Sequence, residues 1–253
     1  MKLTKILFSP TGGTEKVCNQ IAEAMDENAG FIDLCDKKGH FILEEFTKED
    51  VVIIGMPSYG GRAPMVAADR LSMMRGGGAR AVLVCVYGNR AYEDTLVEMQ
   101  DVAEKAGFVV IGAVAAIAEH SMFETFGKKR PDKADRSRLK EIGKELAAKV
   151  ESGETAMPTL PGNRPYKDGM SKVLVPKSKK SCISCGQCVR PCPVGAISKK
   201  DPRQIDKDKC IGCMRCVSQC PVEGKKLKKS SYKMVELAIE KQCKKRKEIE
   251  SYL

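Results

Sequence analysis

The sequence predicts an α/β protein in which a doubly wound sheet of five parallel strands precedes a small, cysteine-rich α+β domain. Over residues 1–152, apolar strand-like runs alternate with segments whose apolar residues recur at helical spacing. Residues 177–229 instead carry eight of the twelve cysteines, in two copies of one pattern. Between them, 153–176 is a linker rich in Gly, Pro and polar residues, and 230–253 is predicted to be a basic C-terminal helix.

The five strands are predicted from short apolar runs and the helices from apolar residues that share one face. The run VVIIGMP is almost continuously apolar, which is typical of a strand buried on both faces of a sheet. Ligands of such sheets bind beyond the carboxyl ends of the strands, so the loops there are expected to form a site. The expected strands are 2–9, 30–36, 50–57, 79–88 and 108–117, and the expected helices are 14–25, 91–107 and about 134–151.

The loop after the first strand, SPTGGT (9–14), has the composition of a phosphate site. Three hydroxyl side chains surround two glycines where a helix begins, and the free amides and dipole of a helix N-terminus favour an anion. The lysine of the G-x-x-x-x-G-K-[ST] motif is absent, so a nucleoside triphosphate is not expected. Taken alone, the loop fits a capped helix start equally well.

Two later loops strengthen the case for a ligand on the same edge of the sheet. MPSYGGRAP (56–64) follows the third strand and YGNRAY (87–92) follows the fourth. Both offer tyrosine rings together with glycine-rich backbone. A flavin requires aromatic or apolar faces for its ring and backbone polar groups for its polar edge.

The cysteine pattern C-x2-C-x2-C-x3-C-P occurs twice, in CISCGQCVRPCP (182–193) and CIGCMRCVSQCP (210–221). This spacing holds two [4Fe–4S] clusters, with the fourth cysteine of each run ligating the cluster of the other run. A zinc ribbon would need only paired knuckles, and a disulfide scaffold would need an oxidising compartment. One cluster is therefore predicted on Cys182, Cys185, Cys188 and Cys220, and the other on Cys210, Cys213, Cys216 and Cys192.

These motifs carry a family resemblance. The cysteine segment resembles a two-cluster ferredoxin, and S-x-T-G-x-T with the two tyrosine loops resembles flavodoxin and its bound FMN. Together they resemble the flavodoxin-like/two-cluster ferredoxin fusions of anaerobic bacteria and archaea, the EFR1-family ferredoxins. PSYGGRAP, YGNRAYED and AEHS (118–121) carry the closer likeness, which covers nearly the whole chain.

The resemblance implies FMN as a cofactor and assigns its contacts. Many flavodoxins enclose the ring with a tryptophan, which this chain lacks, so Tyr59 and Tyr87 would have to serve. Tyr92 would close the pocket, and His120 is expected to be a solvated loop histidine rather than a flavin neighbour. The phosphate would lie against Ser9, Thr11, Gly12, Gly13 and Thr14; the ring would be flanked by Pro57, Ser58, Tyr59, Gly60 and Gly61, with Tyr87, Gly88, Asn89 and Arg90 on its pyrimidine side.

The charge of the chain is uneven. Residues 1–150 carry 21 basic and 22 acidic side chains, whereas residues 151–253 carry 23 and 11. Two thiolate-ligated clusters would offset part of this excess, since each is negatively charged. What remains is concentrated in KKLKK (225–229) and KKRK (244–247), which form either a solvated helix face or a docking surface for an acidic redox partner.

Together, the motifs and the resemblance predict an electron-transfer flavo-iron–sulfur protein in the cytoplasm of an anaerobe, with redox proteins as partners, acidic ones if the basic segments form a docking surface. The N-terminal apolar stretch is too short for a signal peptide, and neither a membrane nor nucleic acid is expected as a partner. A flavin-dependent reductase of a small acceptor is one alternative, and a redox-sensing binding protein that uses its basic helix is another. No G-x-G-x-x-G follows a strand, so direct use of NAD(P)H is not supported.

Overall fold

A six-stranded mixed sheet organises the N-terminal part of the chain in the computed structural model, which describes residues 2–156, 159–169 and 174–253. Five strands are parallel in the order β2-β1-β3-β4-β5, the doubly wound order of flavodoxin-like sheets. The predicted fold class is confirmed. The strands are β1 (Leu3–Leu7), β2 (Gly30–Asp33), β3 (Val51–Pro57), β4 (Arg80–Tyr87), β5 (Val109–Ile117) and β8 (Glu250–Tyr252).

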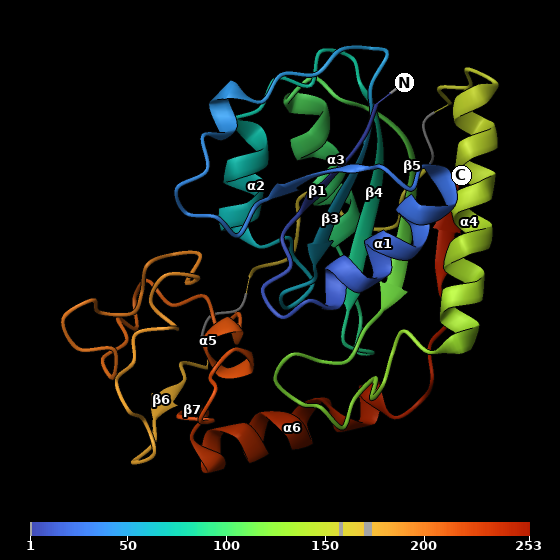
Figure 1. The fold of residues 1–253 in the computed structure, drawn as a ribbon. Coiled ribbons are helices and arrows are strands. Elements are labelled where there is room, and N and C mark those ends of the chain that lie inside the picture. Colours follow the sequence, from blue (N-terminus) through green and yellow to red (C-terminus); the bar gives the residue numbers. More distant parts are fainter. Residues whose placement is uncertain (1, 157–158, 170–173) are drawn as a thin grey trace.

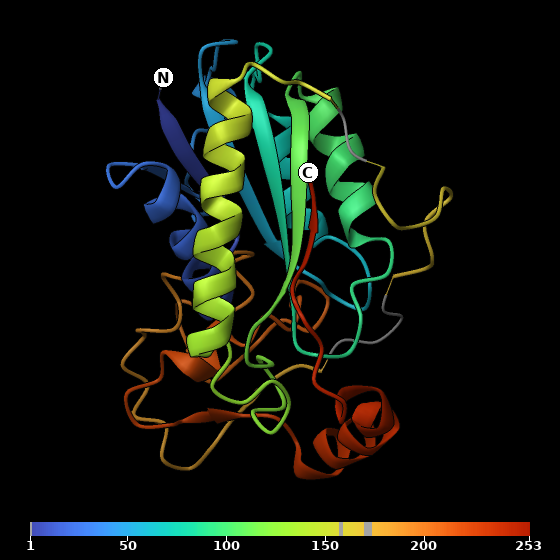
Figure 2. The same cartoon turned by 90° about the vertical axis from the view of Figure 1, so that its right-hand side faces the viewer.

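Helices cover both faces of this sheet (Figures 1 and 2). α1 (Gly13–Met25) and α4 (Lys133–Glu151) pack over one apolar core, and α2 (Met65–Ser72) and α3 (Thr95–Lys105) pack over the other. The sequence pattern does not predict α2, because eight residues are too few to establish a helical period. None of the helices in the described ranges is both long and apolar enough to cross a membrane.

The end of the chain returns to the sheet, which corrects the prediction of a helix over 230–253. Helix α6 (Lys229–Cys243) stops ten residues short of the C-terminus, and β8 then pairs antiparallel with β5, with Ala113 opposite Tyr252. Figure 2 shows β8 running beside β5, where it covers part of an edge that would otherwise present unpaired backbone groups. Local periodicity does not reveal a three-residue strand whose partner lies far away in sequence.

The large apolar residues Met234 and Leu237 of α6 do not lie on its packed face. Met234 and Leu237 are 67% and 57% exposed. The packed face is instead a helical repeat that lies against the loop after β5. Its members are Tyr232, Val235, Ile239 and Cys243, and they contact Phe123 and Phe126.

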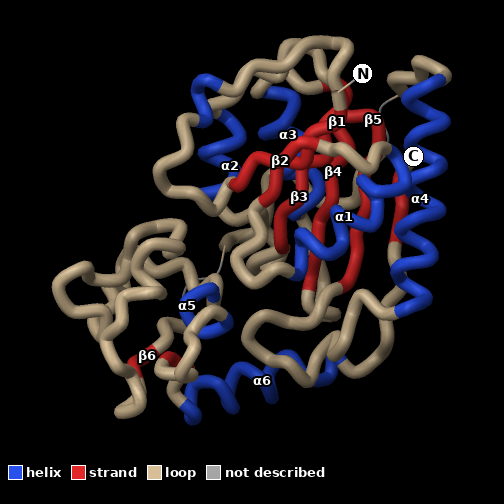
Figure 3. Tube along the Cα trace, in the orientation of Figure 1, coloured by secondary structure: helices blue, strands red, loops and turns tan. Residues whose placement is uncertain are grey.

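The cysteine-rich domain contains little regular structure, and Figure 3 shows it mostly as loop. β6 (Lys177–Ser178) pairs antiparallel with β7 (Lys225–Lys226), and α5 (Arg215–Ser218) is a single helical turn. Its apolar core is small and is built around Cys192, Ala196 and Ile197. A core of this size stabilises a domain only with help from a metal, disulfides or a larger neighbour.

The linker predicted over 153–176 packs along α3 in its described parts, while 157–158 and 170–173 lie outside the described residues. Arg164 forms a two-pronged ion pair with Asp101, at 2.7 Å from Nη2 to Oδ1 and 2.9 Å from Nε to Oδ2. The backbone amides of Asn163 and Lys167 donate to the Asp94 carboxylate at 2.9 Å and 2.7 Å. Residues 163–167 are therefore held against α3 by polar contacts.

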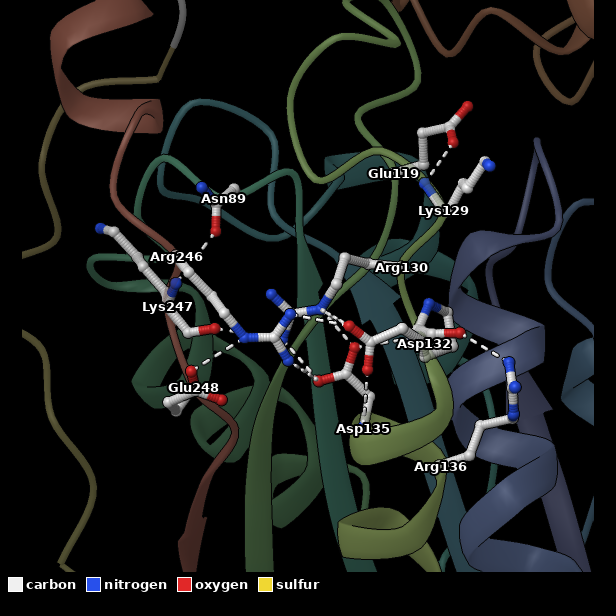
Figure 4. A network of polar contacts seen from close by, with 11 residues as sticks. Asn89, Glu119, Lys129, Arg130, Asp132, Asp135, Arg136, Arg246, Lys247 and Glu248 are labelled. Carbon is white, nitrogen blue, oxygen red and sulfur yellow. Dashed lines mark hydrogen bonds and ion pairs between the residues drawn. The ribbon is translucent and has the colours of Figure 1, made fainter.

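An ion-pair network joins the returning C-terminal segment to the start of α4 (Figure 4). Arg130 and Asp135 are both buried, and Arg130 Nη2 donates to Asp135 Oδ1 at 2.5 Å. Arg246 lies 2.7 Å from Asp132 and 3.3 Å from Asp135. Asp132 and Asp135 also form a capping box at the N-terminus of α4. The guanidinium of Arg246 holds the pKa of Asp132 well below its usual range.

We expect Asp135→Asn to destabilise the protein by about 3–5 kcal/mol, because the variant leaves the Arg130 guanidinium buried without its counter-charge. Glu141→Gln is the matched control, since Glu141 pairs with Arg138 at the surface and its loss should cost less than about 1 kcal/mol. Thermal unfolding of the anaerobic proteins followed by circular dichroism measures both. Equal effects of the two substitutions would contradict the assignment of Arg130–Asp135 as a buried pair.

Candidate functional site

A partly open pocket with a cavity volume of about 180 Å³ lies at the carboxyl ends of the parallel strands. Loops after β1, β3, β4 and β5 line it, as the topology of a doubly wound sheet requires. The cysteine-rich domain contributes Ile211 and Gly212, and α6 contributes Val235 and Ile239. Figure 1 shows α6 passing below these strand ends, beside the cysteine-rich domain. The pocket is thus built from six segments that are separated along the chain.

The loop after β1 forms the polar end of this pocket. Gly12 has a φ of +84°, a left-handed conformation that glycine adopts without strain, and this bend leads the chain into α1. Among the described residues, no hydrogen bond uses the amides of Thr11, Gly13 or Thr14, whereas the Glu15 amide donates to Ser9 Oγ at 3.0 Å. Free amides and two hydroxyls at the positive end of a helix fit the phosphate of FMN.

The opposite part of the pocket is apolar and aromatic. Tyr59 lines it beside Pro57, and burial raises the pKa of its phenol well above the usual range. The Tyr87 ring also lines the pocket but packs on its other side against Tyr92, with ring centroids 5.2 Å apart. Phe123, Ile211 and the two α6 residues add further apolar surface. This combination suits the ring of a flavin, which needs apolar faces rather than charges.

Eleven of the fifteen residues assigned to FMN by resemblance line the pocket, and Gly12, Gly61, Asn89 and Tyr92 do not. The Tyr92 hydroxyl instead lies 2.8 Å from both Glu250 and Tyr252 in the returning segment. The Asn89 side chain is likewise directed away, and its amide donates to the carbonyl of Cys243 at 2.6 Å. The lining residues are Ser9, Thr11, Gly13, Thr14, Pro57, Ser58, Tyr59, Gly60, Tyr87, Gly88 and Arg90.

His120 lines the pocket, so the prediction of a solvated loop histidine is wrong. Its Nδ1 accepts from the amides of Met122 and Phe123 at 3.1 Å and 3.3 Å, and its ring packs on Phe123. Burial, aided by the charge of Arg90, lowers the pKa of His120 to about 4. The neutral ring therefore keeps Nε2–H as its one free donor. A Cβ on Gly88 would lie 2.4 Å from the imidazole, which explains the glycine there.

The second set of predicted cluster ligands shares one cavity. Cys192, from the first cysteine run, lines it together with Cys210, Cys213 and Cys216 from the second. The amide of Ala196 donates to Cys192 Sγ at 3.3 Å. No three His, Cys, Asp or Glu side chains of the described residues converge as they would on a single metal ion. In a cubane each thiolate binds a different iron, so the ligands surround a volume rather than a point.

A cation, Arg215, lines this cavity and favours an anion within it. Its Nε and Nη1 atoms are buried with no hydrogen-bond partner among the described residues. Its nearest carboxylate oxygen, on Asp33 of β2, is 3.9 Å away. Two guanidinium nitrogens buried without a hydrogen-bond partner are costly, and the net negative charge of a thiolate-ligated cluster would offset that cost. The donor set and these two nitrogens both fit a [4Fe–4S] cluster.

The first set lies on the outer side of the domain. Cys185 is exposed, and Cys182 is linked to Cys220 through Gly224, whose amide donates to Cys220 Sγ at 2.9 Å. A Cβ on Gly224 would lie 3.0 Å from Cys182 Cα, so the two cysteines meet across this glycine. Ala196 and Gly224 occupy the same place after the fourth cysteine of each run, and each donates an amide hydrogen to that sulfur. The two halves of the domain thus repeat one local geometry.

Comparison with known proteins identifies the cysteine-rich domain. Residues 181–233 match the family of 4Fe-4S dicluster domains. The chain is a fusion of a flavodoxin-like domain and a 4Fe–4S dicluster domain. A search of curated proteins found no match.

Several solved flavodoxins are distantly similar to the N-terminal domain. A flavodoxin from the domain Archaea is 14% identical, with 60% of this chain and 99% of that chain covered and a TM-score of 0.43. The flavodoxin of Streptococcus pneumoniae TIGR4 is 21% identical, with 58% and 99% covered and a TM-score of 0.41. A Fusobacterium nucleatum flavodoxin bound to flavin mononucleotide is 16% identical, with 59% and 99% covered and a TM-score of 0.43. These likenesses are distant, and the strand order itself establishes the fold.

Replacing Thr11 or Thr14 by Ala should weaken FMN binding roughly 10- to 150-fold, because a hydroxyl contact to a charged phosphate is worth about 1.5–3 kcal/mol. Isothermal titration of the flavin-depleted full chain measures the loss, with exposed Thr125→Ala as control. Riboflavin lacks the phosphate, so it should bind more weakly and be insensitive to both substitutions. Equal affinities of the wild-type protein for FMN and riboflavin would disprove the phosphate loop.

The crossing of the cysteine runs is testable by electron paramagnetic resonance of the reduced protein. Cys192→Ala should perturb the signal of the cluster held by the second run, and Cys220→Ala should perturb that of the first. The two variants serve as controls for each other. If each substitution damaged only the cluster of its own run, the crossed ligand scheme would be wrong.

Proposed function

We propose that this protein is an electron-transfer protein that holds FMN in the pocket of its flavodoxin-like domain and two [4Fe–4S] clusters in its dicluster domain. The observation that carries the proposal is the position of Ile211, which lines both the flavin pocket and the cavity of Cys192, Cys210, Cys213 and Cys216. A bound flavin can exchange one or two electrons, and a [4Fe–4S] cluster exchanges one. Two redox sites that share a lining residue are close enough for direct exchange.

Contacts between the two domains support a fixed spacing of these sites. Arg70 of α2 donates from Nη2 to the carbonyl of Pro193 at 2.6 Å and from Nη1 to the carbonyl of Leu34 at 2.6 Å. Lys37 donates to the carbonyl of Val189 at 3.0 Å. These bonds hold the end of the first cysteine run against the flavodoxin-like domain. The second run then faces the pocket, where Cys210 and Cys213 lie near Tyr59.

The enclosure of the pocket favours an electron carrier over a reductase of small acceptors. Val235 and Ile239 of α6 cover the pocket from one side, and the loop of Ile211 and Gly212 covers it from another. A flavin held beneath these residues would expose less of its ring than one in an open groove. These residues narrow the access of a small acceptor to the ring.

The contacts of KKRK (244–247) disfavour a nucleic-acid-binding sensor. Arg246 is paired with Asp132 and Asp135, and Lys247 Nζ donates to the carbonyl of Arg90. Lys244 lies 3.4 Å from Glu240. Most of this basic segment is therefore engaged within the chain, and it does not form the helix that a groove-binding segment would require.

A reductive titration tests the proposal. Full anaerobic reduction should take up about four electron equivalents per chain, since the flavin accepts two and each cluster one. Cys213→Ala should lower the uptake, whereas Cys35→Ala removes another buried thiol near Tyr59 and should leave it unchanged. An uptake of about two equivalents by the wild-type protein would mean that one domain carries no redox group, and it would overturn the proposal.

The rate of internal transfer tests the spacing separately. After photoreduction of the flavin, bleaching of the cluster absorbance should follow at a rate that does not change with protein concentration. A rate proportional to concentration would mean that electrons pass between molecules. It would contradict direct exchange between the flavin pocket and the cysteine cavity, both of which Ile211 lines.

A further inference from the structure

The outer side of the dicluster domain carries a dense group of cations. A shallow groove there is lined by β6, the lysines that follow it and the loop around Ile205. Within the described residues, the one salt bridge made by these cations is a long contact of 3.8 Å between Lys179 and Glu223. The groove residues with positive charge are Lys177, Lys179, Lys180, Arg203 and Lys207, and we call them the outer basic groove.

This outer basic groove adjoins the first set of cysteines directly. Arg203 Nη2 donates to the carbonyl of Cys182 at 2.8 Å, and the Cys182 amide donates to the carbonyl of Lys179 at 3.2 Å. Lys225 is buried beneath it and donates to Ser178 Oγ at 2.8 Å and to the carbonyl of Pro202 at 2.5 Å. The cations are thus part of the shell around one cluster site, not a distant charged tail.

Exposed apolar residues occupy the same surface. Ile183, between Cys182 and Cys185, is 66% exposed, and Val222, two residues after Cys220, is 36% exposed. The four cysteines of the other set are buried or half-buried and share a cavity with Ile211, which also lines the flavin pocket, whereas Cys185 is exposed. Apolar residues beside a redox site with charges around them have the composition of a transient docking interface.

We propose that the outer basic groove, with Ile183 and Val222, docks an acidic redox protein that exchanges electrons at the cluster site of Cys182, Cys185, Cys188 and Cys220. This inference rests on the proposed electron-transfer function and identifies the surface at which the protein would exchange electrons with its partner. Five cations that make one long salt bridge among the described residues create a positive field that steers a negatively charged partner to this face. Nucleic acid would complement the positive charge, but the exposed apolar residues beside the cysteines would not contribute to binding its phosphates.

The test compares two triple charge reversals that change the net charge equally. Lys177→Glu, Lys180→Glu and Lys207→Glu reverse three exposed cations of the outer basic groove. The matched control is Lys105→Glu, Lys140→Glu and Lys144→Glu, three exposed lysines of the flavodoxin-like domain. The probe is an acidic plant-type [2Fe–2S] ferredoxin, and its reduction by the pre-reduced holoprotein is followed by stopped-flow absorbance.

For the wild-type protein we expect the second-order rate constant to fall at least about tenfold between 0.01 M and 0.5 M salt, because exposed charges are screened beyond the Debye length. The groove variant should be about tenfold slower or more at low salt and should lose the salt dependence. The control variant should stay within about threefold of wild type. Basic cytochrome c, as an opposite probe, should not be slowed by the groove substitutions.

Three results would overturn the proposal: equal slowing in both variants, a wild-type rate insensitive to salt, or tight binding of duplex DNA that only the groove variant loses. A dithionite titration of each variant separates this failure from that of the proposed function. If the groove variant still takes up as many electron equivalents as wild type, its slow reaction with the probe reports docking alone. A wild-type protein that took up too few equivalents would instead count against the redox sites themselves.

Discussion

The pairing of β8 with β5 constrains where the rest of the C-terminal half can lie. Three residues at the end of the chain join the sheet, and the Arg246 contacts with Asp132 and Asp135 strengthen the attachment. Because the chain must reach this edge, α6 has to run beneath the carboxyl ends of the strands (Figure 1). The dicluster domain is thereby held from two sides, by the linker packed on α3 and by α6. Such double attachment limits the orientations that the domain can adopt.

This attachment also determines the character of the flavin pocket. A flavodoxin-like sheet alone supplies loops on one side of its ligand. Here α6 and the second cysteine run add residues from the remaining sides, and they do so only because the C-terminal segment returns. The residues that complete the pocket have few polar groups, so they exclude water without competing for the polar edge of a flavin.

The two cysteine sets of the dicluster domain have different positively charged surroundings. Toward the flavodoxin-like domain, the partly buried Arg215 lines the cavity with two nitrogens that have no hydrogen-bond partner among the described residues. Toward solvent, exposed lysines adjoin the first set, and Lys225 is buried beneath them. The positive excess of residues 151–253 is therefore not a uniform coating. Part of it is used inside the chain, as in KKRK, and part is displayed beside the outer cysteines.

Sequence by itself determined the parts of this protein that depend on local pattern. Strand periodicity, the SPTGGT loop and the doubled cysteine spacing each operate within about ten residues, where backbone geometry and side-chain chemistry leave few options. The parallel order of the five strands followed from their alternation with helices. Four of the loop residues assigned to the flavin nevertheless lie outside the pocket, because resemblance transfers positions and not the contacts that each residue makes in this fold.

Only the tertiary structure decided what depends on distant partners. Tyr92 and Asn89 turn from the pocket because the returning segment offers them hydrogen-bond partners. His120 is withdrawn from solvent by Gly88, Phe123 and backbone amides. Ile211 meets the flavin pocket, and β8 finds β5, through packing between segments widely separated along the chain. No local signal encodes such contacts, since the free energy that selects them arises from burial and pairing in the assembled molecule.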